Sequence, residues 1–346
     1  MKIPERKRNG FIYIKCSYCL RPIHAGREFS ERIKIERGVY YHKGCYNCGQ
    51  KCPVCLKPIS YHQEEESFQH SIWPQIKYCK IHVGQIPKCC ICEKYQPKDE
   101  KYIKLVDERM LCNDCRWTAI MDVDKLQSLK NYLLHFFKVN HVSFKKDIPI
   151  YLVDINDIKR LANRGAVLSD TTIISCTLEE ENMMEIVPNR LQELQLKPPW
   201  ILIAYGLPWL IAGELLAQEM MHVWLQLKKD YKTFNWPLKE GICRAMAYNC
   251  LGYITDPAGS EREKRIKFFQ EMRAFRKTRI QNERPQVFGL GYMGATNAIK
   301  RYGLISTLDR IFAKTNGGTT QAAMNRDEDF EYTPDYVRSL SRKISS

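Results

Sequence analysis

The sequence has no apolar segment long enough to cross a membrane. Its longest apolar run, residues 200–213, is interrupted by Gly206 and Pro208 and leads into the acidic Glu214, whereas a spanning helix needs about 20 apolar residues. Residues 1–10 are basic and lack the apolar core of a secretory signal. These absences predict a protein without membrane contact that resides in the cytoplasm, the nucleus or both.

Acidic side chains are fewer than basic ones. The sequence has 39 Asp and Glu and 54 Lys and Arg, which gives a net charge of +15. Such an excess permits contact with nucleic acid, an anionic membrane or acidic proteins without selecting among them. The composition is not that of a disordered chain, since 44% of the residues are hydrophobic and 11% are aromatic. A length of 346 residues allows two or three domains.

Cysteine is abundant, and 15 cysteines without a secretory signal favour metal binding in a reducing compartment over disulfides. Ten of them form, with two histidines, three groups of two ligand pairs, each pair having a two-residue gap. Group starts at positions 16, 52 and 89 indicate an internal repeat. The predicted ligands are Cys16, Cys19, His42 and Cys45; then Cys52, Cys55, Cys79 and His82; then Cys89, Cys92, Cys112 and Cys115.

A two-residue gap lets one tight turn present two ligands to the same ion, and two such turns complete a tetrahedral zinc site. Each repeat is too short for a hydrophobic core, so zinc must supply much of its folding free energy. Because protein fills all four positions of each site, the three zinc ions are predicted to be structural. Roles other than metal binding are favoured for the remaining cysteines, and His62 and His70 are expected at the surface of a polar loop. These cysteines are Cys48, Cys90, Cys176, Cys243 and Cys250, of which Cys48 and Cys90 lie inside the zinc segments and are alternative ligands.

Apolar periodicity predicts helices at residues 121–138, 209–228, 238–253 and 261–284, with one or two more within 289–314. Strands are expected at residues 149–153, which should be buried, 165–178 and 200–205, and a loop at 179–182. The fold class is therefore α+β. The expected domains are a zinc-knuckle array at residues 11–120, a mixed domain at 121–314 and a mobile tail at 315–346.

The helix predicted at residues 209–228 carries the pentapeptide QEMMH, which lacks only the first histidine of the metallopeptidase motif His-Glu-x-x-His. The full motif places two imidazoles on one helix face and uses the Glu as general base on a zinc-bound water. Here Glu219 is the expected base and His222 the expected second ligand, whereas Gln218 is a neutral amide. A third ligand is expected at Glu240, which would otherwise be a carboxylate at a helix N-terminus. Cys243 is either a core thiol or a stray metal contact.

The sequence around these residues resembles a known family. The segment GELLAQEMMHVWLQL at residues 213–227, the EGIC at 240–243, the PKCCICE at 87–93 and the YGL at 302–304 are similar to the plant LIM-domain, ubiquitin-activated peptidases that limit organ growth, the DA-one family. The resemblance covers residues 11–314 and implies a LIM-like array followed by a zincin-like, gluzincin-type metallopeptidase domain. By matching, His222 and Glu240 would be zinc ligands and Glu219 the base, while Gln218 replaces a zinc-binding His.

The chain departs from the family pattern in its N-terminal part as well. No ubiquitin-interacting motifs precede the zinc knuckles, and a LIM unit holds two zinc ions, so three sites leave one half unit without a partner. The chain begins 15 residues before Cys16, and the first half of a LIM unit is therefore expected to be missing.

Gln218 decides the predicted function. Zinc favours imidazole over a neutral amide oxygen, so a fourth, catalytic zinc is not expected to be held firmly. The sequence favours a pseudo-peptidase that acts as a protein-interaction scaffold or regulator of growth or defence, with ubiquitin or ubiquitin-ligase components among its expected protein partners. The alternatives are a weakly active zinc metallopeptidase that cleaves ubiquitin-pathway proteins, and a basic zinc-finger nucleic-acid binder, for which no base-reading helix is apparent.

Overall fold

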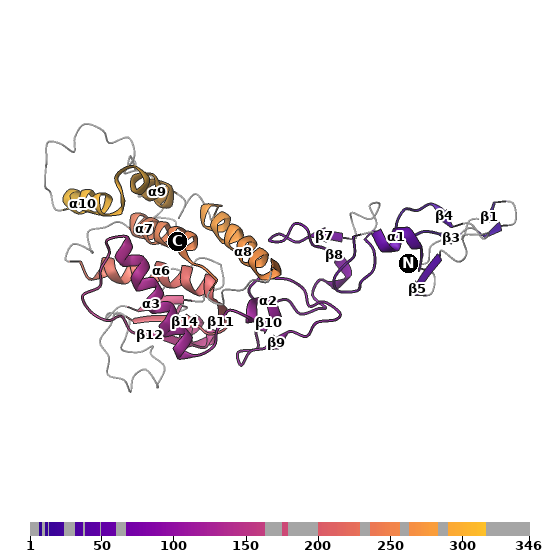
Figure 1. Ribbon diagram of the computed structural model, residues 1–346, viewed down its shortest axis with the longest axis horizontal. Helices are drawn as coiled ribbons and strands as arrows, with labels where there is room; N and C mark the ends of the chain where they lie inside the picture. Colours follow the sequence, from indigo (N-terminus) through magenta and orange to yellow (C-terminus); the bar gives the residue numbers. More distant parts are fainter. Residues whose placement is uncertain are drawn as a thin grey trace, which may run out of the picture. The chain divides into compact units, whose positions relative to one another are not determined.

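The chain divides into two compact units, an N-terminal unit of Met1–Arg116 and a C-terminal unit of Trp117–Ser346 (Figure 1). No helix in the described part of the chain is both long and apolar enough to span a bilayer. The structure, a computed structural model, describes residues 7–8, 11–12, 14–23, 32–36, 39–48, 50–59, 67–162, 175–178, 200–228, 236–256, 263–282 and 290–315.

The described strands of the N-terminal unit form short antiparallel hairpins. They pair β1 (Lys7–Arg8) with β2 (Phe11–Ile12), β3 (Ile14–Lys15) with β4 (Pro22–Ile23), β5 (Arg32–Glu36) with β6 (Val39–His42), β7 (Ser67–Gln69) with β8 (Lys77–Cys79), and β9 (Ile103–Lys104) with β10 (Met110–Leu111). The last predicted ligand of each repeat lies on a helical turn: Cys45 on α1 (Lys43–Cys48), His82 on the 3-10 turn η3 (Lys80–His82) and Cys115 on α2 (Asn113–Arg116).

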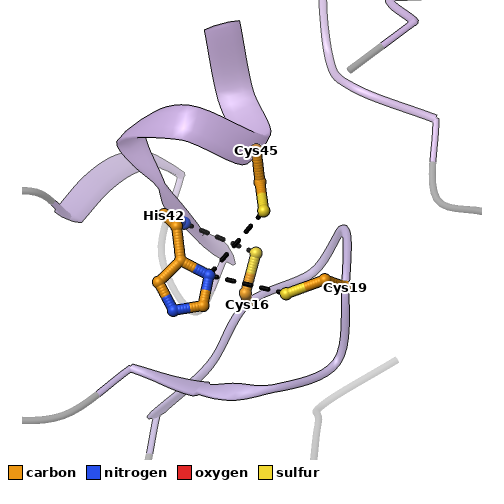
Figure 2. A group of neighbouring side chains, drawn as sticks. All are labelled: Cys16, Cys19, His42 and Cys45. Atoms are coloured by element: carbon orange, nitrogen blue, oxygen red, sulfur yellow. Dashed lines mark hydrogen bonds between the residues drawn. The ribbon is translucent and has the colours of Figure 1, made fainter. Parts of the chain in front are cut away.

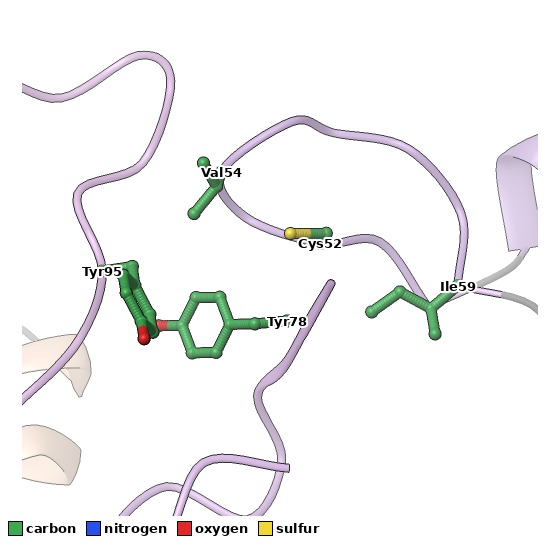
Figure 3. Close-up of a cluster of buried hydrophobic side chains, with 5 residues drawn as sticks. All are labelled: Cys52, Val54, Ile59, Tyr78 and Tyr95. Carbon is green, nitrogen blue, oxygen red and sulfur yellow. The ribbon is translucent and has the colours of Figure 1, made fainter. Parts of the chain in front are cut away.

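The apolar cores of this unit are small and include cysteine side chains. One cluster consists of Cys16, Ile23 and Tyr41. A second, shown in Figure 3, consists of Cys52, Val54, Ile59, Tyr78 and Tyr95. In it the rings of Tyr78 and Tyr95 pack edge to face, with centroids 5.0 Å apart. Because Tyr78 comes from the second repeat and Tyr95 from the third, one core joins these two repeats.

The C-terminal unit contains a three-stranded sheet in the order β12 (Ile150–Val153), β14 (Trp200–Ala204) and β13 (Ser175–Leu178). The central strand β14 is parallel to β12 and antiparallel to β13, with Leu202 opposite both Tyr151 and Cys176. All side chains of β14 are buried, as expected for an unbroken apolar run in the middle of a sheet. A second pairing, of β11 (Ala119–Ile120) with β15 (Leu207–Pro208), brings the chain to the start of the next helix.

The helices of the C-terminal unit are α3 (Val123–Val139), α4 (Ile155–Ala162), α6 (Trp209–Gln226), α7 (Trp236–Tyr253), α8 (Glu263–Asn282), α9 (Leu290–Tyr302) and α10 (Leu304–Thr315). Helix α6 packs against α7, and α7 packs in turn against α9 (Figure 1). Between α9 and α10 the chain turns at Gly303, whose φ of 78° favours a residue without a Cβ.

Helix α6, which carries the QEMMH pentapeptide, is buried on nearly all sides. At Gly213 an added Cβ would lie 2.5 Å from Cδ1 of Ile254, so the glycine permits a close approach to the residue that follows α7. The neighbouring Glu214 is a buried charge, and Arg276 of α8 compensates it by donating from both Nε and Nη2 to its two oxygens, at 2.6 and 2.7 Å. A buried carboxylate of this kind requires such a partner.

Several sequence expectations for this unit are confirmed. The predicted helices at residues 209–228, 238–253 and 261–284 are α6, α7 and α8, and the segment 289–314 forms two helices. The helix predicted from residue 121 begins instead at Val123, because the Asp122 carboxylate accepts a hydrogen bond from the backbone N–H of Lys125 at 2.8 Å and caps it. Met121 therefore lies outside the helix and is 37% exposed.

Other expectations need correction or concern residues that the structure does not describe. Strand β12 is half-buried and not buried, since it lies at the edge of the sheet, and α4 has no counterpart among the predicted elements. The first part of the strand predicted at residues 165–178, the loop at 179–182 and the tail after residue 315 lie outside the described residues.

Candidate metal centres and the motif site

The structure brings the twelve predicted knuckle ligands together in three groups of four. Within each group the ligand atoms all lie within 4.8 Å of one another. The first group is Cys16, Cys19, His42 and Cys45, the second is Cys52, Cys55, Cys79 and His82, and the third is Cys89, Cys92, Cys112 and Cys115. Three metal sites can therefore form, and their thiolate and imidazole donors are those that zinc favours.

The spacing between donor atoms matches a tetrahedral zinc site. With Zn–S near 2.3 Å and Zn–N near 2.0 Å, two sulfurs are about 3.8 Å apart and a sulfur and a nitrogen about 3.5 Å apart. In the first group, Nδ1 of His42 lies 3.5 Å from Sγ of Cys19 and 3.8 Å from Sγ of Cys45 (Figure 2). Sulfur pairs of the second and third groups are 3.9 Å and 3.5 Å apart, Cys55 with Cys79 and Cys92 with Cys112.

Each group begins with the same backbone turn. The N–H of the fourth residue after the first cysteine donates to that cysteine's carbonyl: Leu20 to Cys16 at 2.9 Å, Leu56 to Cys52 at 2.8 Å and Glu93 to Cys89 at 3.0 Å. These donors have φ values of 57°, 60° and 59°, a left-handed conformation that is costly for residues other than glycine. The C-x2-C spacing thus folds into one repeated turn that points both sulfurs of a pair at the same place.

The clustered thiols strongly shift one another's pKa values. Hydrogen bonds from Cys55 and Cys79 hold the pKa of Cys52 far below its usual value, whereas burial and hydrogen bonds to its neighbours raise the pKa of Cys115 well above it. The thiols of one group therefore oppose one another's ionisation when no cation is bound. In the second group Nε2 of His82 is also buried without a hydrogen-bond partner. Both observations suit residues that bind a metal, which lets every thiolate form.

The second and third metal groups are tied to each other by Trp73. Its Nε1 donates to the backbone carbonyl of Cys92 at 3.0 Å. The ammonium of Lys94 lies 4.4 Å from the centroid of the Trp73 ring and 3.2 Å from a carboxylate oxygen of Asp114. The two groups thus share backbone, ring and charge contacts in addition to the Tyr78–Tyr95 core.

The prediction that His70 is a surface histidine is wrong. The side chain is 5% exposed, and its Nδ1 accepts hydrogen bonds from the backbone N–H groups of Ile72 and Trp73 at 3.0 and 3.2 Å. It closes the turn between β7 and β8, and burial lowers its pKa. His62 lies outside the described residues.

The cysteines outside the metal groups occupy different settings. Cys90 is exposed, whereas Cys243 and Cys250 are buried among the C-terminal helices. Cys48 ends α1 and Cys176 belongs to β13, but their side chains lie outside the described part of the structure.

The motif residues form a second kind of site, here called the motif site and defined as Gln218, Glu219, His222 and Glu240. The first three lie on α6 and Glu240 on the first turns of α7. Nε2 of His222 lies 3.2 Å from Oε2 of Glu240, and Nε2 of Gln218 donates to Oε1 of Glu240 at 3.0 Å. Glu219 is buried beside Gln218. The two sequence segments predicted to share a metal are thus brought together.

Arg244, one turn after Glu240 on α7, completes the contacts of that carboxylate. Its Nε donates to Oε1 of Glu240 at 2.6 Å, and the residue is buried. Sequence reasoning missed this residue, although a spacing of four positions on a helix is the signal for such a pair.

Burial alone would raise the pKa of Glu240, but the contacts with His222 and Arg244 outweigh it and lower the pKa to about 2. Burial would likewise lower the pKa of His222, yet the neighbouring Cys243 and Glu240 raise it well above its usual value. The contacts of the site therefore favour an ionised Glu240 carboxylate, which lies against the His222 imidazole and the Arg244 guanidinium.

The motif site does not fit the zinc that its sequence pattern implies. Gln218 directs its amide N–H, and not its oxygen, at Glu240, and the guanidinium of Arg244 donates to the same carboxylate. Among the residues that the structure describes, groups of three or more metal-type side chains within reach of one ion occur at the three knuckle sites and not here.

Comparison with known proteins shows to which family these sequence features belong. A family model described as DA1-like, Protein DA1, matches residues 153–314, which include the motif site. The LIM domain-containing protein HDR3 of Oryza sativa subsp. japonica is 30% identical over 86% of this chain and 67% of its own length. The chain belongs to the DA1 family.

Two other DA1-family relatives, both from Arabidopsis thaliana, are similar over the same share of the chain. Protein DA1 is 29% identical over 86% of this chain and 62% of its own length, and Protein DA1-related 1 is 31% identical over 86% and 60%. The chain thus spans about 60% of the length of these two relatives. No solved structure matches it, so the zincin-like fold expected of a DA1-family chain stays a prediction.

Proposed function

We propose that this DA1-family chain is a zinc-stabilised protein-interaction module joined to a peptidase-related unit that does not cleave peptide bonds. The observation that carries the proposal is the state of Glu240. Both of its oxygens are bonded to protein groups, Oε1 to Gln218 and Arg244 and Oε2 to His222. A carboxylate in this state is a poor metal ligand, because releasing it breaks charge-assisted hydrogen bonds in a buried setting.

Catalysis would need the metal that these contacts oppose. When bound, zinc polarises a carbonyl and lowers the pKa of its water to about 7. Glu219 keeps the position of the general base on α6, but without that water it has no acidic proton to accept. His222 is held by Glu240 and Cys243 instead of facing an open coordination position. The residues that remain of the motif thus stabilise the contact between α6 and α7.

The N-terminal unit supports the interaction role. Its metal groups have four protein ligands each, which is the pattern of structural zinc. Around them, large apolar side chains are exposed, most of all Val106, which is 89% exposed, and Ile81 and Val83, which flank the ligand His82. With the net charge of +15, these side chains suit a protein partner with an acidic rim around an apolar patch. Ubiquitin and ubiquitin-ligase components are the first partners to test.

Metal content and hydrolysis measured on one preparation test the catalytic part of the proposal. The purified chain should carry three zinc ions, and it should release no product from protein or peptide substrates with or without added zinc. The Glu219→Ala variant is the matched control and should behave identically. A fourth tightly held zinc together with hydrolysis that disappears in Glu219→Ala would overturn the proposal in favour of a weak metallopeptidase.

Binding measurements test the interaction part. Labelled ubiquitin titrated with the full chain should show binding that is weakened by Ile81→Ser and Val106→Ser but not by Val139→Ser, an exposed apolar residue of the C-terminal unit. Equal loss with all three variants, or with none, would contradict a role for the knuckle surface. Tight binding to nucleic acid that weakens steeply with salt would favour the nucleic-acid alternative.

A further inference from the structure

We propose that Arg244 takes the place of the peptidase zinc, supplying from the protein the positive charge that a metal ion would give Glu240. The motif site is then a metal-independent contact between α6 and α7, and Gln218 and Arg244 act as a pair. The inference rests on the proposed absence of a catalytic zinc and goes further, because it names the group that has replaced the metal.

The first observation is the placement of the guanidinium. Nε of Arg244 lies 2.6 Å from Oε1 of Glu240, and both residues are at least nine-tenths buried. A buried carboxylate needs a compensating charge. At a metal site the ion supplies it, whereas here a side chain of the same helix does.

The second observation concerns the number of donors at Glu240. Oε1 accepts from both Arg244 Nε and Gln218 Nε2, which fills the two lone-pair positions of that oxygen. Oε2 faces Nε2 of His222 at 3.2 Å. The nitrogen and the oxygens that would bind a metal are thus occupied by one another and by two donors.

The third observation is the chemistry of Gln218. A histidine at this position would be neutral when it binds zinc and would present a lone pair to the ion. The amide of Gln218 presents an N–H to the carboxylate instead. Gln218 therefore bridges α6 to α7 through Glu240 without any metal, and restoring the histidine alone leaves Arg244 bound to the expected third ligand.

A simple ion pair between residues four apart on a helix would behave differently. It would contribute to stability on its own and would have no bearing on what residue 218 can bind. Measurements on four forms of the full chain distinguish the two possibilities. The forms are wild type, Gln218→His, Arg244→Gln, and the double variant Gln218→His with Arg244→Gln.

Zinc per chain, zinc affinity and the melting temperature of the C-terminal unit are measured for each form. Wild type and Gln218→His should hold three tight zinc ions. Arg244→Gln should melt roughly 10 °C lower and should not be rescued by zinc. The double variant should bind a fourth zinc at least 100-fold more tightly than Gln218→His, and that zinc should restore its melting temperature.

The control replaces another buried cation of the same unit. Lys130 is buried and pairs with Asp147 at 2.6 Å, so Gln218→His with Lys130→Gln should lose stability without gaining a fourth zinc. A fourth tight zinc in this control would show that mere loosening opens the site and would overturn the proposal.

Three results would overturn the role of Arg244 while leaving the proposed function intact: a tight fourth zinc in Gln218→His alone, an unchanged melting temperature in Arg244→Gln, or a double variant that stays unfolded in excess zinc. Four tight zinc ions in the wild-type chain would instead contradict the proposed function itself. The failures of the two proposals are therefore distinguishable.

Discussion

In the N-terminal unit the described metal-type groups consist of thiols and imidazoles that lie against one another, whereas the carboxylate of the motif site in the C-terminal unit lies against a guanidinium of its own helix. Cys89, Cys92, Cys112 and Cys115 are all buried, and their sulfurs lie against one another. Glu240 is equally buried, but Arg244 and His222 lie against it. Two kinds of potential metal ligand, thiols and a carboxylate, thus have different electrostatic settings in one chain.

This difference indicates how side chains that need a metal ion can be distinguished from side chains that no longer need one. Buried thiols that can ionise only at one another's expense require an outside cation to be stable together. A buried carboxylate that already accepts from a guanidinium, an amide and an imidazole does not. The charge balance around the buried ligands, in addition to their type and spacing, therefore separates a site that binds a metal from one that has lost it.

Removal of zinc should have the largest effect, because it should destabilise the N-terminal unit and leave the motif site intact. Structural zinc contributes about 10–16 kcal/mol per site in isolated knuckle peptides, so a strong chelator should unfold the N-terminal unit and leave α6 and α7 folded. Hydrogen exchange measured by mass spectrometry, with and without chelator, reports the two units separately. Simultaneous loss of protection in α6 and α7 would mean that the motif site also depends on metal.

Separating Glu214 from Arg276 should have the next largest effect, confined to the C-terminal unit. Arg276→Met leaves the buried Glu214 carboxylate without its two charge-assisted hydrogen bonds, which should lower the free energy of unfolding by about 3–5 kcal/mol. Denaturant unfolding measures the change, and Arg276→Met with Glu214→Leu is the control that removes both charges. If the double variant is as unstable as the single one, the cost is lost packing and not an unpaired charge.

The stability that the ionised Glu240 contributes to the C-terminal unit should depend on pH. Because the pKa of Glu240 is lowered from 4.5 to about 2, its contribution is fully present above pH 4.5 and is lost as the pH falls towards 2. The lowered pKa corresponds to about 3 kcal/mol of unfolding free energy. The difference in unfolding free energy between wild type and Glu240→Gln should therefore be largest between about pH 4.5 and 6.5. It should shrink below that range as Glu240 takes up a proton, and above it as His222, whose pKa Glu240 helps to raise, releases its own. A difference that stays constant down to pH 2 would contradict the ionised pair.

The smallest expected effect is at the repeated knuckle turn. Leu56 has a φ of 60°, which costs about 1–2 kcal/mol for a leucine, while a glycine there would lose a similar amount through the greater freedom of the unfolded chain. Leu56→Gly should therefore keep its zinc and change stability by less than about 1 kcal/mol. Loss of one zinc per chain in this variant would show that the leucine side chain itself holds the site together.

Sequence spacing was sufficient to predict which twelve side chains come together in three groups of four, because C-x2-C turns are local and their geometry follows from a few residues. The pairing of Glu240 with His222 was also predictable, through the motif and its following helix. The partnership of Glu214 with Arg276 was not, because the two residues are 62 positions apart and only packing of α8 brings them together. His70 was misjudged for a similar reason, since a polar loop sequence does not reveal that its ring closes a turn.

The shared core of Tyr78 and Tyr95, together with the hydrogen bond from Trp73 to Cys92, has a consequence for metal loading. An ion bound by the second group orders the residues that the third group needs, and by thermodynamic reciprocity the third favours the second by the same factor. The first group is linked to them by a looser contact, Lys51 over the ring of Tyr46. The second and third ions should therefore enter and leave together, so that partly loaded chains hold either the first ion alone or the second and third together.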